Sequence, residues 1–280
     1  MKESVRQGKE QRKATLHLSK IGTVKVVLHR AMEGPIKTCA IKREIDQWYV
    51  IFICEVQGEV LPVSSEQVGI DLGVTHLAAL SDGTFIDHPR YFRGAQKKLV
   101  ATQRAKDRRK KGSHRQRKAQ RQIAKCHRKI RNQRRDFLHK QSRKLVNRFQ
   151  MIVFEDLPIA NLVRAPKPKQ DEATGKYLPN GASAKAGLNK SILDAGWGMF
   201  MEMIIVKAAS AGRTVLFVDP ARTSQTCPNC GTIRKKTLEE RWHSCVCGCE
   251  LDRDTASAKV ILDVGRKHFS VGTRPTSATA

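Results

Sequence analysis

The most regular hydrophobic pattern in the chain is a short alternating stretch in its first third. Residues 68–73 read V-G-I-D-L-G, with an apolar side chain at every second position, which is the period of a β-strand. Asp71, a residue type that is rare in strands, stands between two glycines that leave room beside the backbone. A carboxylate fixed by a sheet suits a metal ion that needs rigidly placed oxygen ligands. The alternative is that Asp71 only caps a local backbone group.

Short runs rich in β-branched residues predict further strands. A turn at 81–83 is expected to return the chain as a second strand at 84–86. Before residue 60, runs separated by Gly and Pro turns predict strands at 23–28, 38–43 and 47–56. Short antiparallel strands of this kind are typical of part of a small β-barrel.

Two near-continuous apolar runs have the pattern of strands that are covered on both faces. They lie at 151–157 and 214–220. The first run contains Glu155 and Asp156 near its end. It therefore predicts a second strand of a covered sheet that carries carboxylates at its edge.

A period near 3.6 residues predicts the helices. Residues 94–149 are expected to form two long helices that break at Gly112, with Ser113 as the N-cap of the second. That second helix carries one narrow apolar stripe on an otherwise cationic surface. Further helices are expected at 189–211 and 252–264. Strands that alternate with helices in this way indicate an α/β layer architecture.

Four segments are expected to lie outside these elements. They are a basic, disordered or helical lead-in at 1–14, a linker at 61–65, a mobile loop at 164–190 and a tail from Ser270.

The charge of the chain is far from balanced. Lys and Arg number 53 against 26 Asp and Glu, a formal net charge of +27. Residues 91–150 contain 23 Lys and Arg and two Asp, a net of +21, so most of the excess lies on the two long helices. A solvated helix face normally mixes both signs. This concentration indicates a surface that binds the phosphates of a polyanion.

The cysteines and the apolar runs indicate the compartment. Five of the eight cysteines fall within 227–249, which favours a metal site in a reducing compartment over a disulfide framework. The N-terminus has no apolar core of a signal peptide. The longest apolar run, at 48–54, is too short to span a bilayer. We therefore expect a cytoplasmic protein with no membrane partner.

The cysteine spacing predicts one structural zinc ion. Cys227 and Cys230 form a C-x-x-C-G knuckle, and the second pair follows 14 residues later, close to known zinc spacings. Cys247 is favoured in the second pair because a glycine follows it, as one follows Cys230. The predicted ligands are Cys227, Cys230, Cys245 and Cys247, and Cys249 with His243 is the alternative.

Beyond the cysteines, a helix is expected to begin at either of two acids, Asp252 or Asp254, each of which would serve equally well as a helix cap. Together with Asp71 and Glu155, one of these acids would complete a group of three carboxylates. Such a group can hold two Mg²⁺ ions, which generate a hydroxide and neutralise the leaving oxygen of a phosphodiester.

Four motifs in this order resemble a known protein family. They are G-I-D-L-G at 69–73, F-E-D-L at 154–157, T-S-Q-T-C-P-N-C-G at 223–231 and C-x-C-G-x-x-x-D-R-D at 245–254. They resemble TnpB, the OrfB-type protein of bacterial insertion sequences, a family similar to the type V CRISPR effector nucleases. The resemblance extends from about residue 18 to residue 265.

The resemblance implies an α/β fold, in which an RNase H-like (RuvC) domain carries a long basic helical hairpin and an inserted zinc ribbon and follows part of a small β-barrel, the wedge domain. The implied domains are the partial wedge barrel at 1–66, the RuvC-like nuclease domain at 67–220 with the basic helices at 91–150, the zinc ribbon at 221–250, the last RuvC segment at 251–269 and a tail at 270–280.

The resemblance also implies an activity, namely RNA-guided, Mg²⁺-dependent cleavage of DNA. The partners would be a guide RNA made by the transposon end and a target DNA, met at the prokaryotic nucleoid; the oligomeric state stays open. The implied catalytic and metal-binding acids are Asp71, Glu155 and Asp254, with Asp252 and Asp156 as neighbours.

Two departures from the family pattern favour alternatives. The family carries Asn two residues after the last acid, where this chain has Ala256; a lost polar neighbour weakens the support of metal ligands. The resemblance also implies a longer N-terminal part, so we expect a shortened member. The first alternative is a nuclease-dead nucleic-acid-binding protein or regulator with the same fold. The second is a transposase that transfers DNA strands with the same metal chemistry.

Overall fold

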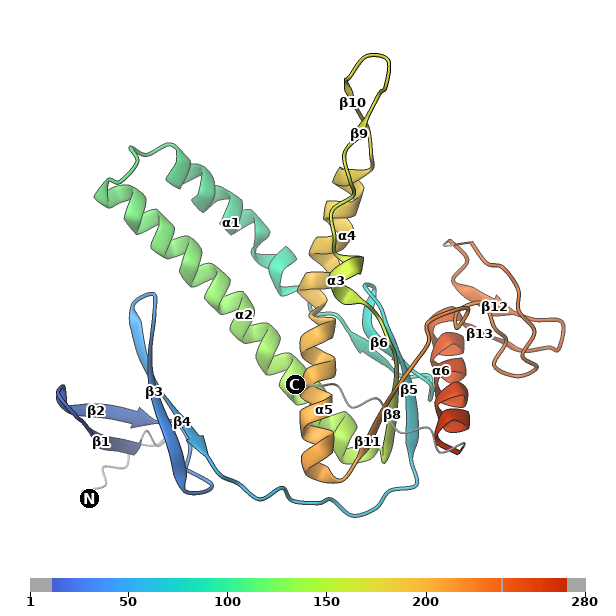
Figure 1. Cartoon of the computed structure of the whole chain (residues 1–280), viewed down its shortest axis with the longest axis horizontal. Coiled ribbons are helices and arrows are strands. Elements are labelled where there is room, and N and C mark those ends of the chain that lie inside the picture. Colours follow the sequence, from blue (N-terminus) through green and yellow to red (C-terminus); the bar gives the residue numbers. More distant parts are fainter. Residues whose placement is uncertain (1–11, 238, 271–280) are drawn as a thin grey trace. The chain divides into compact units, whose positions relative to one another are not determined.

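The computed structural model describes residues 12–237 and 239–270, which divide into two compact units between Gly58 and Glu59 (Figure 1). The family resemblance implied a first domain at residues 1–66. Residues of the expected linker at 61–65 lie in the second unit, where Leu61 N donates to Ala211 O at 3.1 Å.

The first unit consists of two antiparallel hairpins. Their strands are β1 (Arg12–Leu18), β2 (Gly22–Leu28), β3 (Ile36–Glu44) and β4 (Gln47–Cys54). In the described residues the pairs β1–β2 and β3–β4 form separate two-stranded sheets, so the predicted part of a barrel is present only as two hairpins. The predicted disordered or helical lead-in at 1–14 is wrong for residues 12–14, because they belong to β1. Residues 1–11 of that prediction lie outside the described residues.

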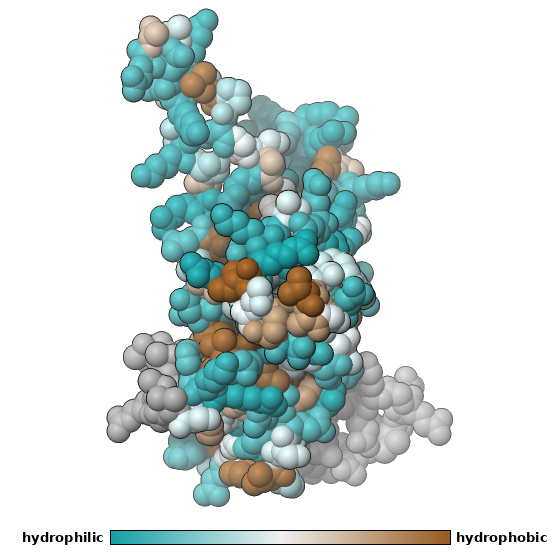
Figure 2. Space-filling view, turned by 90° about the vertical axis from the view of Figure 1, so that its right-hand side faces the viewer, coloured by the Kyte–Doolittle hydropathy of each residue, from teal (hydrophilic) through white to brown (hydrophobic). Residues whose placement is uncertain are grey.

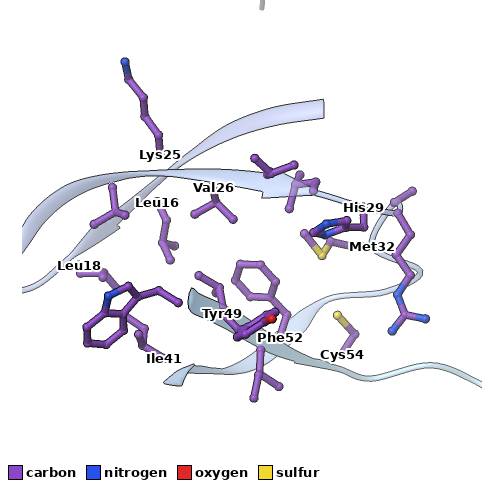
Figure 3. A pocket seen from close by; sticks show the side chains of 18 of the residues that line it. Leu16, Leu18, Lys25, Val26, His29, Met32, Ile41, Tyr49, Phe52 and Cys54 are labelled. Atoms are coloured by element: carbon purple, nitrogen blue, oxygen red, sulfur yellow. The ribbon is translucent and has the colours of Figure 1, made fainter. Parts of the chain in front are cut away.

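An apolar hollow of about 1300 Å³ separates the two hairpins (Figure 3). Leu16 and Val26 line it from the first hairpin, and Ile41 and Phe52 from the second. The inward side chains of both hairpins therefore share one apolar space, although no ladder joins the sheets within the described residues.

The second unit is built on a mixed five-stranded sheet. Its strands are β5 (Gln67–Leu72), β6 (His76–Leu80), β7 (Phe85–Asp87), β8 (Met151–Glu155) and β11 (Thr214–Val218). The spatial order is β11-β8-β5-β6-β7. β5, β8 and β11 run parallel, whereas β6 and β7 pair antiparallel. The stretch with the alternating pattern thus forms the central strand.

Six helices and two short hairpins complete the described part of the second unit. The helices are α1 (Tyr91–Asp107), α2 (His114–Arg148), α3 (Ile159–Leu162), α4 (Ala182–Ala195), α5 (Trp197–Ala211) and α6 (Arg253–Ser270). The hairpin strands are β9 (Lys169–Gln170) with β10 (Tyr177–Leu178), and β12 (Trp242–Ser244) with β13 (Glu250–Asp252).

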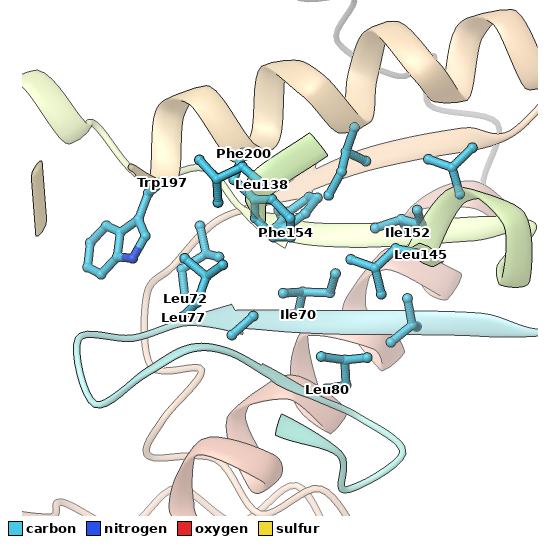
Figure 4. Close-up of a cluster of buried hydrophobic side chains, with 14 of the residues drawn as sticks. Ile70, Leu72, Leu77, Leu80, Leu138, Leu145, Ile152, Phe154, Trp197 and Phe200 are labelled. Atoms are coloured by element: carbon cyan, nitrogen blue, oxygen red, sulfur yellow. The ribbon is translucent and has the colours of Figure 1, made fainter. Parts of the chain in front are cut away.

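The helices cover both faces of the sheet. α2 and α5 pack on one face, where Leu138, Phe200 and Phe154 form part of the main core (Figure 4). α6 packs on the other face, where Ile261 contacts the cluster that contains Val153. The central strands are therefore covered on both sides, which explains why β8 is apolar almost throughout.

Two predicted segments differ from the structure. The helix expected at 189–211 is two helices, because Gly196 between α4 and α5 adopts a left-handed φ of 74°. The loop expected at 164–190 contains the β9–β10 hairpin and the first turns of α4, which begins at Ala182. By contrast, the helix break before α2 is confirmed, and the Ser113 side chain accepts from Gln116 N at 3.2 Å as the predicted N-cap.

Helix α6 approaches the central strand so closely that only glycine fits between them. A Cβ atom on Gly69 would lie 2.1 Å from the carbonyl oxygen of Ala258 and 2.6 Å from Leu262 N. Both are backbone atoms of α6, so neither can move without the helix. Gly69 therefore sets the distance between α6 and the sheet.

We expect Gly69→Ala to lower the free energy of unfolding by at least the ~1–3 kcal/mol that is typical of overpacked cores. Gly94→Ala is the matched control, because Gly94 lies exposed in α1 and its added Cβ would meet no atom within 4 Å. That change should stabilise by roughly 0.5–1 kcal/mol. Urea unfolding of both variants measures the difference, and equal stabilities would contradict the close packing of α6.

Candidate active site and metal centre

The alternation of side chains along β5 and β8 places two acids on one face of the sheet. On β5, Ile70 and Leu72 belong to the core under α2 and α5, so Asp71 points to the opposite face. On β8, Val153 belongs to the cluster under α6, and Glu155 follows it by two residues. Both carboxylates therefore project from the face that α6 covers.

The strand register and the start of α6 bring the third acid to the same place. β5 and β8 pair in parallel with Ile70 opposite Phe154, so the next step along the strands brings Asp71 beside Glu155. Asp254 lies in the first turn of α6. The Asp252 carboxylate accepts from Asp254 N at 2.9 Å, which makes Asp252 the helix cap and leaves the Asp254 side chain free of that role.

The negative charges of Glu155 and Asp254 act on Asp71. The pKa of Asp71 is raised to about 8, first by burial and then by these two charges. A hydrogen bond with Ser257 and the charge of Arg253 work in the opposite direction. Burial likewise raises the pKa of Glu155, which a hydrogen bond from Thr223 lowers. Without a cation this group of acids is electrostatically unfavourable.

The acids are spread more widely than the ligands of a single small ion. Among the described residues, the groups of three or more ligand atoms that all lie within 4.8 Å of one another consist of cysteine and histidine only. The oxygens of Asp71, Glu155 and Asp254 therefore do not all approach that closely. Such a spread is compatible with two ions about 3.5–4 Å apart, each of which contacts a part of the set.

Four cysteine sulfurs form the first of these compact groups. They belong to Cys227, Cys230, Cys245 and Cys247. The Sγ atoms of Cys227 and Cys247 lie 3.7 Å apart, and those of Cys230 and Cys245 lie 3.5 Å apart. A tetrahedral ion with Zn–S bonds of about 2.3 Å would separate its sulfurs by about 3.8 Å. The four sulfurs thus fit a zinc ion.

A second group shares Cys227 and adds His243 and Cys249. His243 is only 1% exposed, and its Nε2 has no hydrogen-bond partner among the described residues. Its Nδ1 contacts the side-chain nitrogen of Lys236. Because Cys227 belongs to both groups, a single ion at Cys227 would use one group or the other. The sulfur separations favour the four cysteines.

The basic helices are fixed to this unit by a buried ion pair. Arg134 of α2 donates to Asp194 of α4 at 2.8 Å, and the same carboxylate accepts from Phe92 N at the start of α1 at 3.1 Å. Asp194 therefore joins three helices. Beyond this anchor, the exposed sides of α1 and α2 carry the concentrated positive charge that the sequence indicated.

The face with α6 and the β12–β13 hairpin is mostly hydrophilic. Figure 2 shows hydrophobic residues there as separate patches between hydrophilic ones. In the described residues no helix is long and apolar enough to cross a membrane.

Sequence reasoning missed two polar residues that contact the acids. Thr223 donates to Glu155, and Ser257 is hydrogen-bonded to Asp71. Ser257 lies three residues after Asp254, on the same side of α6, so helical periodicity would have found it once the helix start was known. Thr223 has no such signal, because it lies in an irregular turn. Ala256, where the family pattern has Asn, is buried.

Comparison with known proteins finds similarity to one family. The OrfB_IS605 family model, described as "Probable transposase", matches residues 52–165, and the model of the Cas12f1-like TNB domain matches residues 197–261. The "Putative RNA-guided DNA endonuclease InsQ" of Escherichia coli (strain K12) is 35% identical over 94% of this chain. A Streptomyces pristinaespiralis protein named "Putative RNA-guided DNA endonuclease" is 37% identical over 78% of it.

The chain resembles the OrfB-type TnpB family over most of its length. It spans 65% of the length of the Escherichia coli relative and 50% of the Streptomyces one. Among solved structures, the chain in "Cryo-EM structure of the Cas12f1-sgRNA-target DNA complex" superimposes with a TM-score of 0.47 and 15% identity, over 91% of this chain and 65% of that chain.

Asp71 should make the stability of the protein depend on pH when divalent cations are absent. Its pKa is about 8 in the folded chain against the ordinary aspartate value of 3.8, so between these values the folded state holds a proton that the unfolded state has lost. Stability therefore falls as pH rises towards 8 and is constant above it. Asp71→Asn removes this loss. We expect the free energy of unfolding of the Asn variant, relative to that of the wild type, to be higher at pH 9 than at pH 6.

Urea unfolding in Mg²⁺-free, zinc-containing buffer at the two pH values measures this gain. Glu172→Gln, at an exposed acid, is the control. A stability difference between Asp71→Asn and wild type that stays the same at both pH values would contradict the raised pKa.

Zinc content separates the two groups of sulfur ligands. We expect about one zinc per wild-type chain, loss of the ion in Cys247→Ser, and retention in Cys249→Ser, because Cys249 lies outside the group of four. Elemental analysis of the purified variants measures the ratio. Loss of zinc in Cys249→Ser together with its retention in Cys247→Ser would assign the ion to the group with His243.

Proposed function

We propose that this chain is the nuclease part of a transposon-encoded, RNA-guided DNA endonuclease that hydrolyses phosphodiester bonds with Mg²⁺. The observation that carries the proposal is the convergence of three acids from two strands and a helix start. The β5–β8 register brings Asp71 beside Glu155, and Asp254, in the first turn of α6, acts on Asp71 by its charge. Three acids that are distant in sequence thus share one electrostatic site. The names of the similar proteins support DNA as the substrate and RNA as the guide.

The fold supports an RNase H-like, RuvC-type domain. The acids lie at the ends of the two central parallel strands and in the first turn of the last helix. Asp71, Glu155 and Asp254 would hold two Mg²⁺ ions, which would supply a hydroxide nucleophile and neutralise the leaving oxygen. The chain itself contributes the direction of each carboxylate. β5 and β8 fix Asp71 and Glu155, and the Asp252 cap fixes the start of α6 beside them.

The cysteine segment would be a zinc ribbon with one structural ion. Cys227, Cys230, Cys245 and Cys247 have the donor chemistry and the spacing for it. The short β12–β13 hairpin buries little apolar side chain, and Trp242 is exposed. In such a segment, metal binding would supply much of the folding free energy.

The basic hairpin of α1 and α2 would track the backbone of the guide–target duplex. Arg117, Lys118 and Arg121 are exposed on one stretch of α2. Contacts of this kind carry charge and shape recognition, whereas base pairing carries the sequence. Each phosphate that these residues neutralise would release counterions, which makes the affinity depend on salt.

A nuclease-dead binding protein or regulator is the alternative function. Ala256 in place of the family's Asn supports it. The intact acids Asp71, Glu155 and Asp254 support the nuclease. A strand-transferring transposase would use the same acids but join DNA ends instead of leaving them free.

We expect Asp71→Ala to abolish Mg²⁺-dependent cleavage of DNA while the affinity for nucleic acid changes less than about twofold. The variant removes a proposed ligand but none of the basic residues. The assay uses the chain co-purified with RNA from its native locus, with a matching DNA target, in Mg²⁺ and in EDTA. Asp156→Ala is the control, since Asp156 is exposed beside the site.

Three outcomes distinguish the functions. Free DNA ends that require Asp71 support the endonuclease, and joined ends support the transposase. Binding without cleavage in the wild type supports the regulator. Unchanged cleavage by Asp71→Ala would contradict the proposed acid centre.

A further inference from the structure

The joint between β11 and the cysteine segment carries a buried hydroxyl that contacts an acid of the site. Thr223 is 5% exposed, and its Oγ1 donates to Glu155 Oε1. The carbonyl oxygen of Pro220 lies 3.1 Å from the same hydroxyl. A hydroxyl has a single proton, and the ionised carboxylate is the stronger acceptor of the two. Thr223 is therefore built to hold one oxygen of Glu155.

The turn that contains Thr223 is tied to the first cysteine knuckle. The carbonyl of Arg222 accepts from Gln225 N at 2.9 Å and from Thr226 N at 3.0 Å, which closes the turn directly after Thr223. The next residue, Cys227, donates its N–H to Thr232 O at 2.9 Å. The turn that contains Thr223 and the knuckle are thus consecutive hydrogen-bonded structures.

The other end of the cysteine segment also reaches the acids. Arg253 begins α6, and its Nη1 donates to the carbonyls of Thr237 and Glu240, at 3.1 Å each. Its backbone N–H donates to Arg241 O at 3.0 Å. The charge of the same guanidinium acts on Asp71. The segment between the two ends is therefore attached to the acid site on both sides.

We propose that Thr223 is a positioning residue, which holds Glu155 in the direction in which it binds a divalent ion and is itself held by the cysteine knuckle. The inference rests on the proposed acid centre and assigns a role that the motif itself does not reveal. Glu155 lies at the end of its strand with a long, rotatable side chain. Without a partner it would sample several rotamers, and each binding event would have to order it again.

The test measures Mn²⁺ binding, as a probe for the site, to the full chain loaded with zinc and free of nucleic acid. Thr223→Val keeps the shape of the side chain and removes the hydroxyl. We expect it to weaken Mn²⁺ binding about 10–100-fold, the usual effect of losing a hydrogen-bond partner of a metal ligand. Electron paramagnetic resonance of free Mn²⁺ in a titration gives the affinity, and Asp71→Ala defines binding outside the site.

Two control variants separate positioning from a general effect on the turn. Thr226→Val also removes a hydroxyl from this turn, but among the described residues that hydroxyl bonds only to Arg222 O, at 2.9 Å. The Mn²⁺ affinity of this variant should equal that of the wild type. Thr223→Ser keeps the hydroxyl and should retain wild-type affinity. Zinc content of about one per chain in every variant shows that the knuckle is intact.

Each result decides between the claims. Wild-type Mn²⁺ affinity in Thr223→Val, together with lost binding in Asp71→Ala, would overturn the role of Thr223 and leave the acid centre in place. Unchanged binding in Asp71→Ala would overturn the acid centre itself. If Thr223→Val fails to fold, Thr223→Ser decides, and weakened binding by a zinc-loaded Ser variant would contradict the inference.

Discussion

The mutual repulsion of carboxylates on the face beneath α6 is the constraint on which the rest of this structure depends. Close packing of α6 against Gly69 and the parallel pairing of β5 with β8 bring Asp71 and Glu155 together near the start of the helix. Burial and like charge raise the pKa of Asp71 to about 8. A fold that only needed stability would gain from an apolar residue there. The arrangement becomes favourable when cations neutralise the acids, which is the chemistry that phosphodiester hydrolysis requires.

The elements that support this site come from distant parts of the chain. α2 and α5 fill the opposite face of the sheet with the main core and so leave the α6 face to the acids. The cysteine segment is attached at one end through Thr223 and at the other through Arg253. A metal-stapled segment between these two points would give the acid site a rigid frame that a loop of the same length lacks. The basic hairpin is anchored separately, through Asp194.

The sequence predicted the core of the fold because its signals there are local. The alternation around Asp71, the apolar run before Glu155 and the N-cap Ser113 each depend on a few neighbouring residues, and each element formed as expected. The errors came from longer range. The break at Gly196 depends on how two helices pack, and the separate hairpins of the first unit depend on pairings that no short pattern specifies. The role of Thr223 was invisible, because a turn residue shows no period.

The location of bound metal ions tests the central claim most directly. Crystals grown or soaked with Mn²⁺ and measured at the manganese absorption edge would show each ion as an anomalous peak. We expect two peaks about 3.5–4 Å apart, within bonding distance of carboxylate oxygens from Asp71, Glu155 and Asp254. Absence of ions among these three acids in crystals that bind Mn²⁺ elsewhere would contradict the account.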